Sequence, residues 1–191
     1  MVLHEKGINF EVHEVDLSNK SEEFLSVSPY GKVSVLRFKG TSLHESNTVN
    51  EYLDEVYESP KLMPDDPEEW ASVCSWMAFA GDYFFLSVFT VRMGLQRGYS
   101  EDEVQETKEK LYDALSRLEH QLEGREYLVG GYTLADIAHA GNFYRLRVLT
   151  KSGEFPLHEY PNVVAWMERI EGRERATRLS YRAQSHSLAP L

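Results

Sequence analysis

Hydrophobic and polar positions follow two different periods in the first third of the chain. Apolar residues recur at every second position between residues 8 and 16, which predicts a half-buried strand. A serine then caps a short predicted helix over 21–27. Two further strands are expected over 33–38 and 41–44, joined by a tight hairpin turn. A helix over 46–57 completes an order of strand, helix, hairpin and helix.

A proline-rich segment over 59–67 is the best domain boundary in the chain. Every later segment has the helical period, and no strand is needed beyond it. We expect helices over 68–96, 101–122, 134–149 and 161–170. The sequence therefore predicts a mixed first domain and an all-helical second domain.

Two capping boxes mark the starts of predicted helices. Ser100 with Glu103 begins one of them, and Thr133 with Asp136 begins another. A functional carboxylate at Asp136 is the alternative interpretation of the second box. The structural role is favoured, because capping explains both polar residues.

The charge balance excludes one class of partner. The 191 residues include 20 Lys and Arg against 31 Asp and Glu, a net charge of −11. Binding to phosphates needs clustered positive charge, so we expect no nucleic-acid partner. The start of the chain lacks the pattern of a secretion signal, which predicts a cytoplasmic location.

One apolar segment raises the question of a membrane span. In residues 76–93, 13 of 18 side chains are apolar, which is close to the length of a spanning helix. Asp82 and Arg92 interrupt the segment, and its flanks are polar. We interpret it as a buried helix and expect no membrane partner.

Several short motifs, in order, resemble the glutathione transferase family. The motifs are Lys6-Gly7-Ile8, Asn19-Lys20, the run from Ser28 to Val33, Glu45-Ser46-Asn47, the run from Asn50 to Glu55, Tyr127 to Gly130, and Thr133 to Ala138. The resemblance implies a thioredoxin-like glutathione-binding domain over 1–62 and an all-α helical-bundle domain over 68–191. It also implies a homodimer with glutathione as co-substrate and detoxification of a small-molecule electrophile as a role.

The resemblance implies a glutathione site in the first domain. Ser46 begins a helix, where a hydroxyl and unpaired N–H groups favour a carboxylate, and the family holds the γ-glutamyl carboxylate there. Glu45 corresponds to an acid that helps hold the ligand, and Lys32 to a cation for the other carboxylate. Val33 is expected to offer backbone groups to the cysteinyl part, with its side chain in the core. Helix capping by Ser46 and a solvated Lys32 are the structural alternatives.

The chain departs from the family pattern at two places. Ser34 stands where the family has a cis-proline, and a non-proline cis bond costs about 2.5–4 kcal/mol, so a trans bond is expected. The family also has a first strand and most of a helix before the segment matching residues 1–7, whose glycine ends that helix. The residue that activates the thiol lies there. We therefore expect an incomplete first domain without its first strand, no assignable catalytic residue and little transferase activity.

Other reactive side chains carry no assignment. Cys74 shares a helical stripe with apolar residues and is expected to be a small buried core residue. The seven histidines lack metal-ligand spacing, so we assign no metal.

The resemblance places the electrophile pocket against the first long helix of the second domain. The candidates are Asp82, Tyr83, Phe85, Phe89 and Arg92. The same helix usually forms the dimer interface, so core or dimer contacts are the alternative for each of them.

Two functions remain open from the sequence. One is a glutathione transferase that conjugates glutathione to a hydrophobic electrophile or uses it as a thiol reductant. The other is a non-catalytic relative that resembles the stringent starvation protein branch, which binds RNA polymerase. Ser34 would be harmless in such a binding module.

Overall fold

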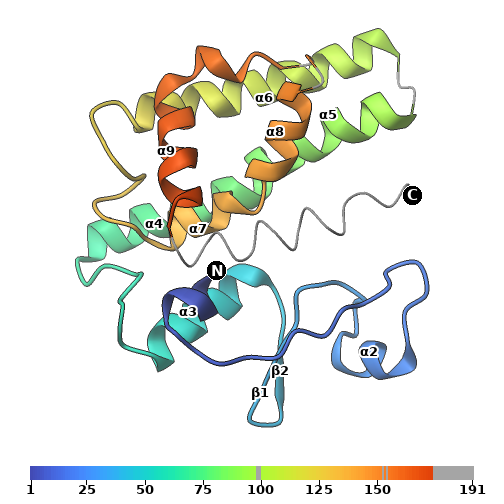
Figure 1. The fold of residues 1–191 in the computed structure, drawn as a ribbon, viewed down its shortest axis with the longest axis vertical. Helices are drawn as coiled ribbons and strands as arrows, with labels where there is room; N and C mark the ends of the chain where they lie inside the picture. The colour runs from blue at the N-terminus through green and yellow to red at the C-terminus, as the bar shows by residue number, and fades with distance from the viewer. Residues whose placement is uncertain (98–99, 152, 154, 174–191) are drawn as a thin grey trace. The chain divides into compact units, whose positions relative to one another are not determined.

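The computed structural model describes residues 1–97, 100–151, 153 and 155–173, drawn in colour in Figure 1. The chain forms two compact units, of which one comprises Val2–Lys61 and the other begins at Leu62. The elements of the first unit are α1 (Val2–Glu5), α2 (Glu22–Val27), β1 (Leu36–Phe38), β2 (Thr41–Leu43) and α3 (Ser46–Val56).

The predicted hairpin is confirmed, with shorter strands than expected. β1 and β2 pair antiparallel, with Leu36 opposite Leu43. The turn between them uses Lys39 and Gly40, both at positive φ. Ser21 caps α2 as predicted, because its hydroxyl accepts a hydrogen bond from the Phe24 N–H at 3.1 Å.

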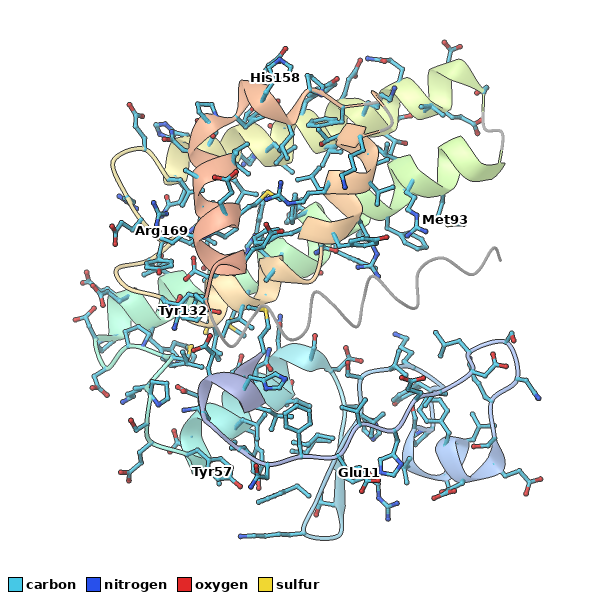
Figure 2. All side chains as sticks on the ribbon, viewed as in Figure 1. Glu11, Tyr57, Met93, Tyr132, His158 and Arg169 are labelled. Atoms are coloured by element: carbon cyan, nitrogen blue, oxygen red, sulfur yellow. The ribbon has the colours of Figure 1, made fainter. Side chains whose placement is uncertain are left out.

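The chain leaves α1 at a glycine, as the sequence predicts. Gly7 has φ +64°, and its N–H donates to the His4 carbonyl at 3.0 Å. The side chain of the preceding residue, Lys6, is fully buried and forms an ion pair of 2.7 Å with Asp54 of α3. Its ammonium also donates to the carbonyls of Tyr57 and Pro60, so one lysine joins both ends of this unit. Figure 2 labels Tyr57.

The predicted strand over residues 8–16 is wrong. The segment has no regular secondary structure, and Phe10 and Val12 are 36% and 51% exposed. Alternation makes a strand only where a neighbouring strand accepts its backbone hydrogen bonds. Within the described residues, the one sheet consists of β1 and β2, and neither pairs with this segment.

The second unit is helical. Its elements are α4 (Pro67–Phe79), the π-helix η1 (Ala80–Phe85), α5 (Leu86–Arg97), α6 (Glu101–Gln121), α7 (Leu134–Ala140), α8 (Phe143–Lys151), the 3-10 helix η2 (Leu157–Glu159) and α9 (Pro161–Glu171). The first three run on as one long helix, which confirms the helix expected over 68–96. The helix expected over 134–149 is two helices, because α7 ends at Ala140, with Gly141 as its C-cap, and α8 begins at Phe143.

Both predicted capping boxes are present, and the second one organises the core. The Asp136 carboxylate accepts hydrogen bonds from the N–H groups of Leu128 and Thr133 and from the indole of Trp166 at 2.8 Å. Burial nevertheless raises its pKa. One carboxylate thereby joins the loop before α7 to α9, so the structural role of Asp136 accounts for all its contacts.

His139 lies one turn further along α7, in a fully buried ring of aromatic side chains. Its Nδ1 lies 2.8 Å from the Ala135 carbonyl. The neighbouring rings are those of Trp76, Phe79, Phe84 and Trp166. Among the described residues, no group hydrogen-bonds its Nε2. Burial lowers the pKa of this imidazole to about 4, so it is neutral at physiological pH.

By length and composition alone, the long helix formed by α4, η1 and α5 is long and apolar enough to cross a membrane. The span Pro67–Gly94 has a mean hydropathy of 1.3 in its most apolar window, a third of which is buried. Core helices of soluble proteins have the same composition. Here the helix packs against α6, α7 and α8, and its buried stripe includes Val73, Met77 and Phe84. Cys74 lies beside this stripe and is half-buried, so the expectation of a small buried core residue is wrong.

Candidate functional site

A tight loop after α2 shapes one side of a pocket in the first unit. The buried Ser28 hydroxyl accepts a hydrogen bond from the Lys32 N–H at 3.1 Å and donates to the Lys32 carbonyl at 2.8 Å. Gly31 lies inside this loop at φ +59°, and a Cβ there would approach Lys20 Nζ to 3.2 Å. The loop therefore requires glycine at this position, and it fixes the backbone that leads to Val33.

The start of α3 shapes the opposite side. Glu45 is the N-cap residue of α3. Its backbone has φ +63°, a conformation that residues other than glycine rarely adopt. Its carbonyl accepts from the Val49 N–H at 3.0 Å, but its side chain caps nothing. Ser46 follows as the first helical residue. The first N–H groups of a helix lack partners within the helix, so this end attracts negative charge.

The pocket between these two sides encloses about 130 Å³. Its lining residues are Ser28, Tyr30, Lys32, Val33, Ser34, His44, Glu45 and Ser46. All four residues assigned to glutathione from the sequence are thus brought together. In the described part of the chain, the side chains of Lys32, Glu45 and Ser46 form no hydrogen bond or ion pair with another residue.

Two expectations about the Val33 region are wrong. The Val33–Ser34 peptide bond is cis, not trans. The Val33 side chain is 53% exposed and does not belong to the core, because the residue lies in the loop before β1 and lines the pocket.

Four residues of the pocket were missed in the sequence. Ser28, Tyr30, Ser34 and His44 line it together with the predicted set. Ser28 and Tyr30 belong to the Ser28–Val33 motif, and His44 precedes Glu45 directly, so adjacency to the motifs was the available signal. The role of Ser28 depends on a loop hydrogen bond that no sequence pattern specifies.

The candidates on the long helix separate into two groups. Phe85 and Phe89 stack with ring centroids 5.6 Å apart, and Arg92 follows one turn later. Tyr83 stacks instead on Phe79 at 5.4 Å and is 62% exposed. Asp82 is exposed and forms no ion pair within the described chain. The structure therefore brings Phe85 and Phe89 together, with Arg92 one turn further along the helix, and it stacks Tyr83 on a different ring.

No group of three or more metal-ligating side chains occurs among residues 1–97, 100–151, 153 and 155–173. The polar groups of the pocket are one ammonium, one carboxylate, an imidazole, hydroxyls and helix N–H groups. Such a set can bind a zwitterion by charge and hydrogen bonding.

A hairpin-and-helix unit with a polar pocket, followed by an all-helical unit, defines a two-domain class with a thioredoxin-like first domain. Residues 1–56 match the family described as "Glutathione S-transferase, N-terminal domain". Residues 76–174 match "Glutathione S-transferase, C-terminal domain". The chain belongs to the glutathione S-transferase family.

Individual relatives agree with this assignment. The chain is 33% identical over 185 residues to glutathione S-transferase F14 of Arabidopsis thaliana. The aligned region covers 90% of this chain and 73% of that protein. The crystal structure of glutathione transferase F2 from Populus trichocarpa is 27% identical, with a TM-score of 0.81 over 96% of this chain and 91% of that one. Glutathione S-transferase 1-6 from Anopheles dirus species B, at 24% identity, shares the fold with a TM-score of 0.86 over 98% and 90% of the two chains.

Proposed function

We propose that the pocket of the first unit binds glutathione. The Ser46 hydroxyl and the N-terminus of α3 hold the γ-glutamyl carboxylate, and Glu45 holds the ammonium beside it. Lys32 faces the glycine carboxylate, and the backbone of Val33 pairs with the cysteinyl residue in the manner of an added strand.

The observation that carries this proposal is the set of unpartnered polar side chains in one pocket. Glutathione carries two carboxylates and one ammonium at neutral pH. Lys32, the helix N-terminus and Glu45 offer the complementary charges, and none of these side chains bonds to another described residue. Each is therefore available without breaking a contact within the protein.

With glutathione bound, the protein acts as a cytoplasmic glutathione transferase. Together with a segment that carries a thiol-activating residue, it transfers glutathione to a small hydrophobic electrophile or uses it as a thiol reductant, and it serves in detoxification. No residue among 1–191 is assigned to activate the thiol, so for these residues alone we expect little transferase activity. We propose a homodimer as well, because the long helix exposes large apolar side chains, including Trp70 and Leu86, at 49% and 51%.

Calorimetric titration with glutathione tests the pocket. Ser46→Ala removes a hydrogen bond to a charged group, so we expect about tenfold weaker binding or more. Ser26→Ala is the matched control, because the Ser26 hydroxyl bonds only within α2, to the Glu23 carbonyl. It should bind as tightly as the unaltered chain.

A second ligand separates the two ends of the pocket. The C-terminal amide of the dipeptide γ-glutamylcysteine lacks the glycine and has no second carboxylate, so Lys32→Met should weaken glutathione binding and leave binding of this amide unchanged. If the unaltered chain binds neither ligand, the proposal fails, and a partner-binding module resembling the stringent starvation protein is the better account.

A further inference from the structure

One titratable side chain of the pocket, His44, has no partner in the glutathione complex proposed above. It lies between β2, which ends at Leu43, and Glu45, the N-cap residue of α3. The residue lines the pocket and is half-buried. Within the described residues its imidazole forms no hydrogen bond, ion pair or ring contact. A paired strand on one side and a helix on the other fix its backbone, so the ring is held at the pocket with its nitrogens available.

The charges of the pocket leave bound glutathione uncompensated. At neutral pH the ligand carries two carboxylates and one ammonium, so one negative charge is in excess. Among the lining residues, Lys32 contributes a positive charge and Glu45 a negative one, and these cancel. The whole chain adds a net charge of −11. A proton on His44 balances the excess, so electrostatics favour binding of this ligand together with a proton.

The position of His44 selects one of the two ligand carboxylates. His44 lies two residues before Ser46, where the proposed complex has the γ-glutamyl carboxylate at the N-terminus of α3. Lys32, in the loop on the opposite side of the pocket, faces the glycine carboxylate instead. An imidazolium next to a helix N-terminus adds a full positive charge to the partial charge of the helix dipole, so one carboxylate gains from both.

Other titratable groups near His44 do not explain a change of charge near neutral pH. Tyr30, Lys32 and Glu45 line the pocket with it. A histidine ordinarily changes charge between about pH 5 and 8, whereas lysine, glutamate and tyrosine ordinarily do not. On α3 and on the elements that pack against β2 and α3, the remaining titratable residues are Arg37, Lys39, His4, Glu5, Lys6, Glu51, Tyr52, Asp54 and Glu55, and none of them lines the pocket.

We propose that protonated His44 binds the γ-glutamyl carboxylate, so that glutathione binds together with a proton and binds more tightly in mildly acidic solution. The inference rests on the proposed function, because it adds a binding residue to the same pocket. By linkage, the bound ligand raises the affinity of His44 for its proton by the same factor by which the proton raises the affinity for the ligand. A neutral imidazole that forms a single hydrogen bond gives no such dependence.

Calorimetric titration with S-methylglutathione, a probe without a titrating thiol, tests the proposal. We expect the unaltered chain to bind the probe about threefold more tightly at about pH 6 than at about pH 8, the effect of an ion pair between partly exposed groups. His44→Gln keeps a hydrogen-bonding side chain without the charge and should bind equally at both pH values. His44→Lys carries the charge throughout and should also bind independently of pH, at least as tightly as the unaltered chain at the lower pH.

His13→Gln is the matched control, because His13 is an exposed histidine of the same unit, lies 3.7 Å from Glu11 and does not line the pocket. It should keep the full pH dependence. The C-terminal amide of γ-glutamyl-S-methylcysteine has only the γ-glutamyl carboxylate and should show the same dependence as the longer probe. Loss of the dependence with this amide would overturn the assignment of His44 to that carboxylate.

NMR of the imidazole gives an independent measurement. The ring C–H signals of His44, assigned by their loss in His44→Gln, should titrate at higher pH with saturating S-methylglutathione than without it. An unchanged titration would overturn the inference.

The outcomes separate this inference from the proposed function. Equal affinity of the unaltered chain at both pH values would overturn the inference and leave the glutathione site standing. A pH dependence that persists in His44→Gln would also overturn it, because another group would then carry the proton. If the probe binds at neither pH, the proposed function fails and the inference fails with it.

Discussion

The buried His139 makes the stability of the protein depend on pH in a way that one substitution removes. The imidazole is fully buried among aromatic rings, and its pKa is lowered to about 4 from the ordinary 6.5. The imidazole has the higher pKa in the unfolded chain and therefore binds a proton more readily there. Acidification thus favours unfolding. His139→Leu has similar volume and no titrating group, and it should abolish this part of the pH dependence.

The size of the effect follows from the two pKa values. Stability is unaffected above about pH 6.5 and is lost between there and about pH 4, by about 3 kcal/mol in total. At about pH 5.5 the loss is about 1.3 kcal/mol relative to about pH 7.5. This lower pH remains above the pI of 5.1, where the protein is least soluble.

Urea unfolding followed by circular dichroism, at one protein concentration and at both pH values, gives the two free energies of unfolding. Asp136, whose pKa is raised, contributes with the opposite sign, but equally in both proteins. The difference in pH dependence between the unaltered chain and His139→Leu therefore isolates the histidine. His158→Gln is the matched control for the loss of a histidine, because His158 is exposed (Figure 2) and lies outside the buried aromatic ring around His139.

Equal pH dependence in the unaltered chain and in His139→Leu would refute the argument. It would mean that the imidazole is protonated or solvated in the folded protein. A smaller loss in the unaltered chain than in the variant would reverse the sign and exclude burial as the dominant cause.

Three further substitutions test contacts of the fold. Asp136→Asn replaces a carboxylate that accepts hydrogen bonds from several donors by an amide, one end of which is itself a donor, and it removes the charge from the bond with Trp166. The free energy of unfolding, measured with urea, should fall by about 3 kcal/mol. Lys6→Met leaves the buried Asp54 carboxylate without this cation and should cost about 3–5 kcal/mol by the same assay, whereas replacing Asp54 with Leu as well should recover most of it. Gly31→Ala forces a side chain into positive φ at a cost of roughly 1–2 kcal/mol and should also weaken glutathione binding in calorimetry; unchanged affinity would show that the loop conformation is not needed.

Helices were predictable because their cause is local. The capping residues Ser100 and Thr133 and the proline at residue 161 lie within one turn of the backbone groups they serve, so the sequence contains both partners. Whether a helical segment is an α-helix or a π-helix could not be predicted from the sequence. In the π-helix Ala80–Phe85 each hydrogen bond spans five residues and not four, and such a segment has no composition of its own.

Features that depend on distant residues were not predictable in the same way. Residues 8–16 have the alternation of a strand, but whether they form one depends on a neighbouring strand. Lys6 occurs in a family motif, yet its burial against Asp54 joins positions 48 residues apart in sequence. Arg145 meets Phe85 only because α8 packs on α5.

The candidate pocket was predictable from motifs, and its limits were not. Lys32, Val33, Glu45 and Ser46 belong to short runs that resemble the family, and they line one pocket. The exposure of Val33 depends on the local course of the backbone, which residue types alone did not indicate.

Backbone amide NMR during titration with glutathione tests the central claim most directly, because it reports where the ligand binds. The account predicts saturable shifts at the amides of residue 28 and of residues 30–34 and 44–48, which line or flank the pocket, and their loss in Ser46→Ala. It predicts that the amides of Arg92 and Arg145 remain unshifted. Saturable shifts confined to the helical unit, or none in either unit, would contradict the claim that this pocket is a glutathione site.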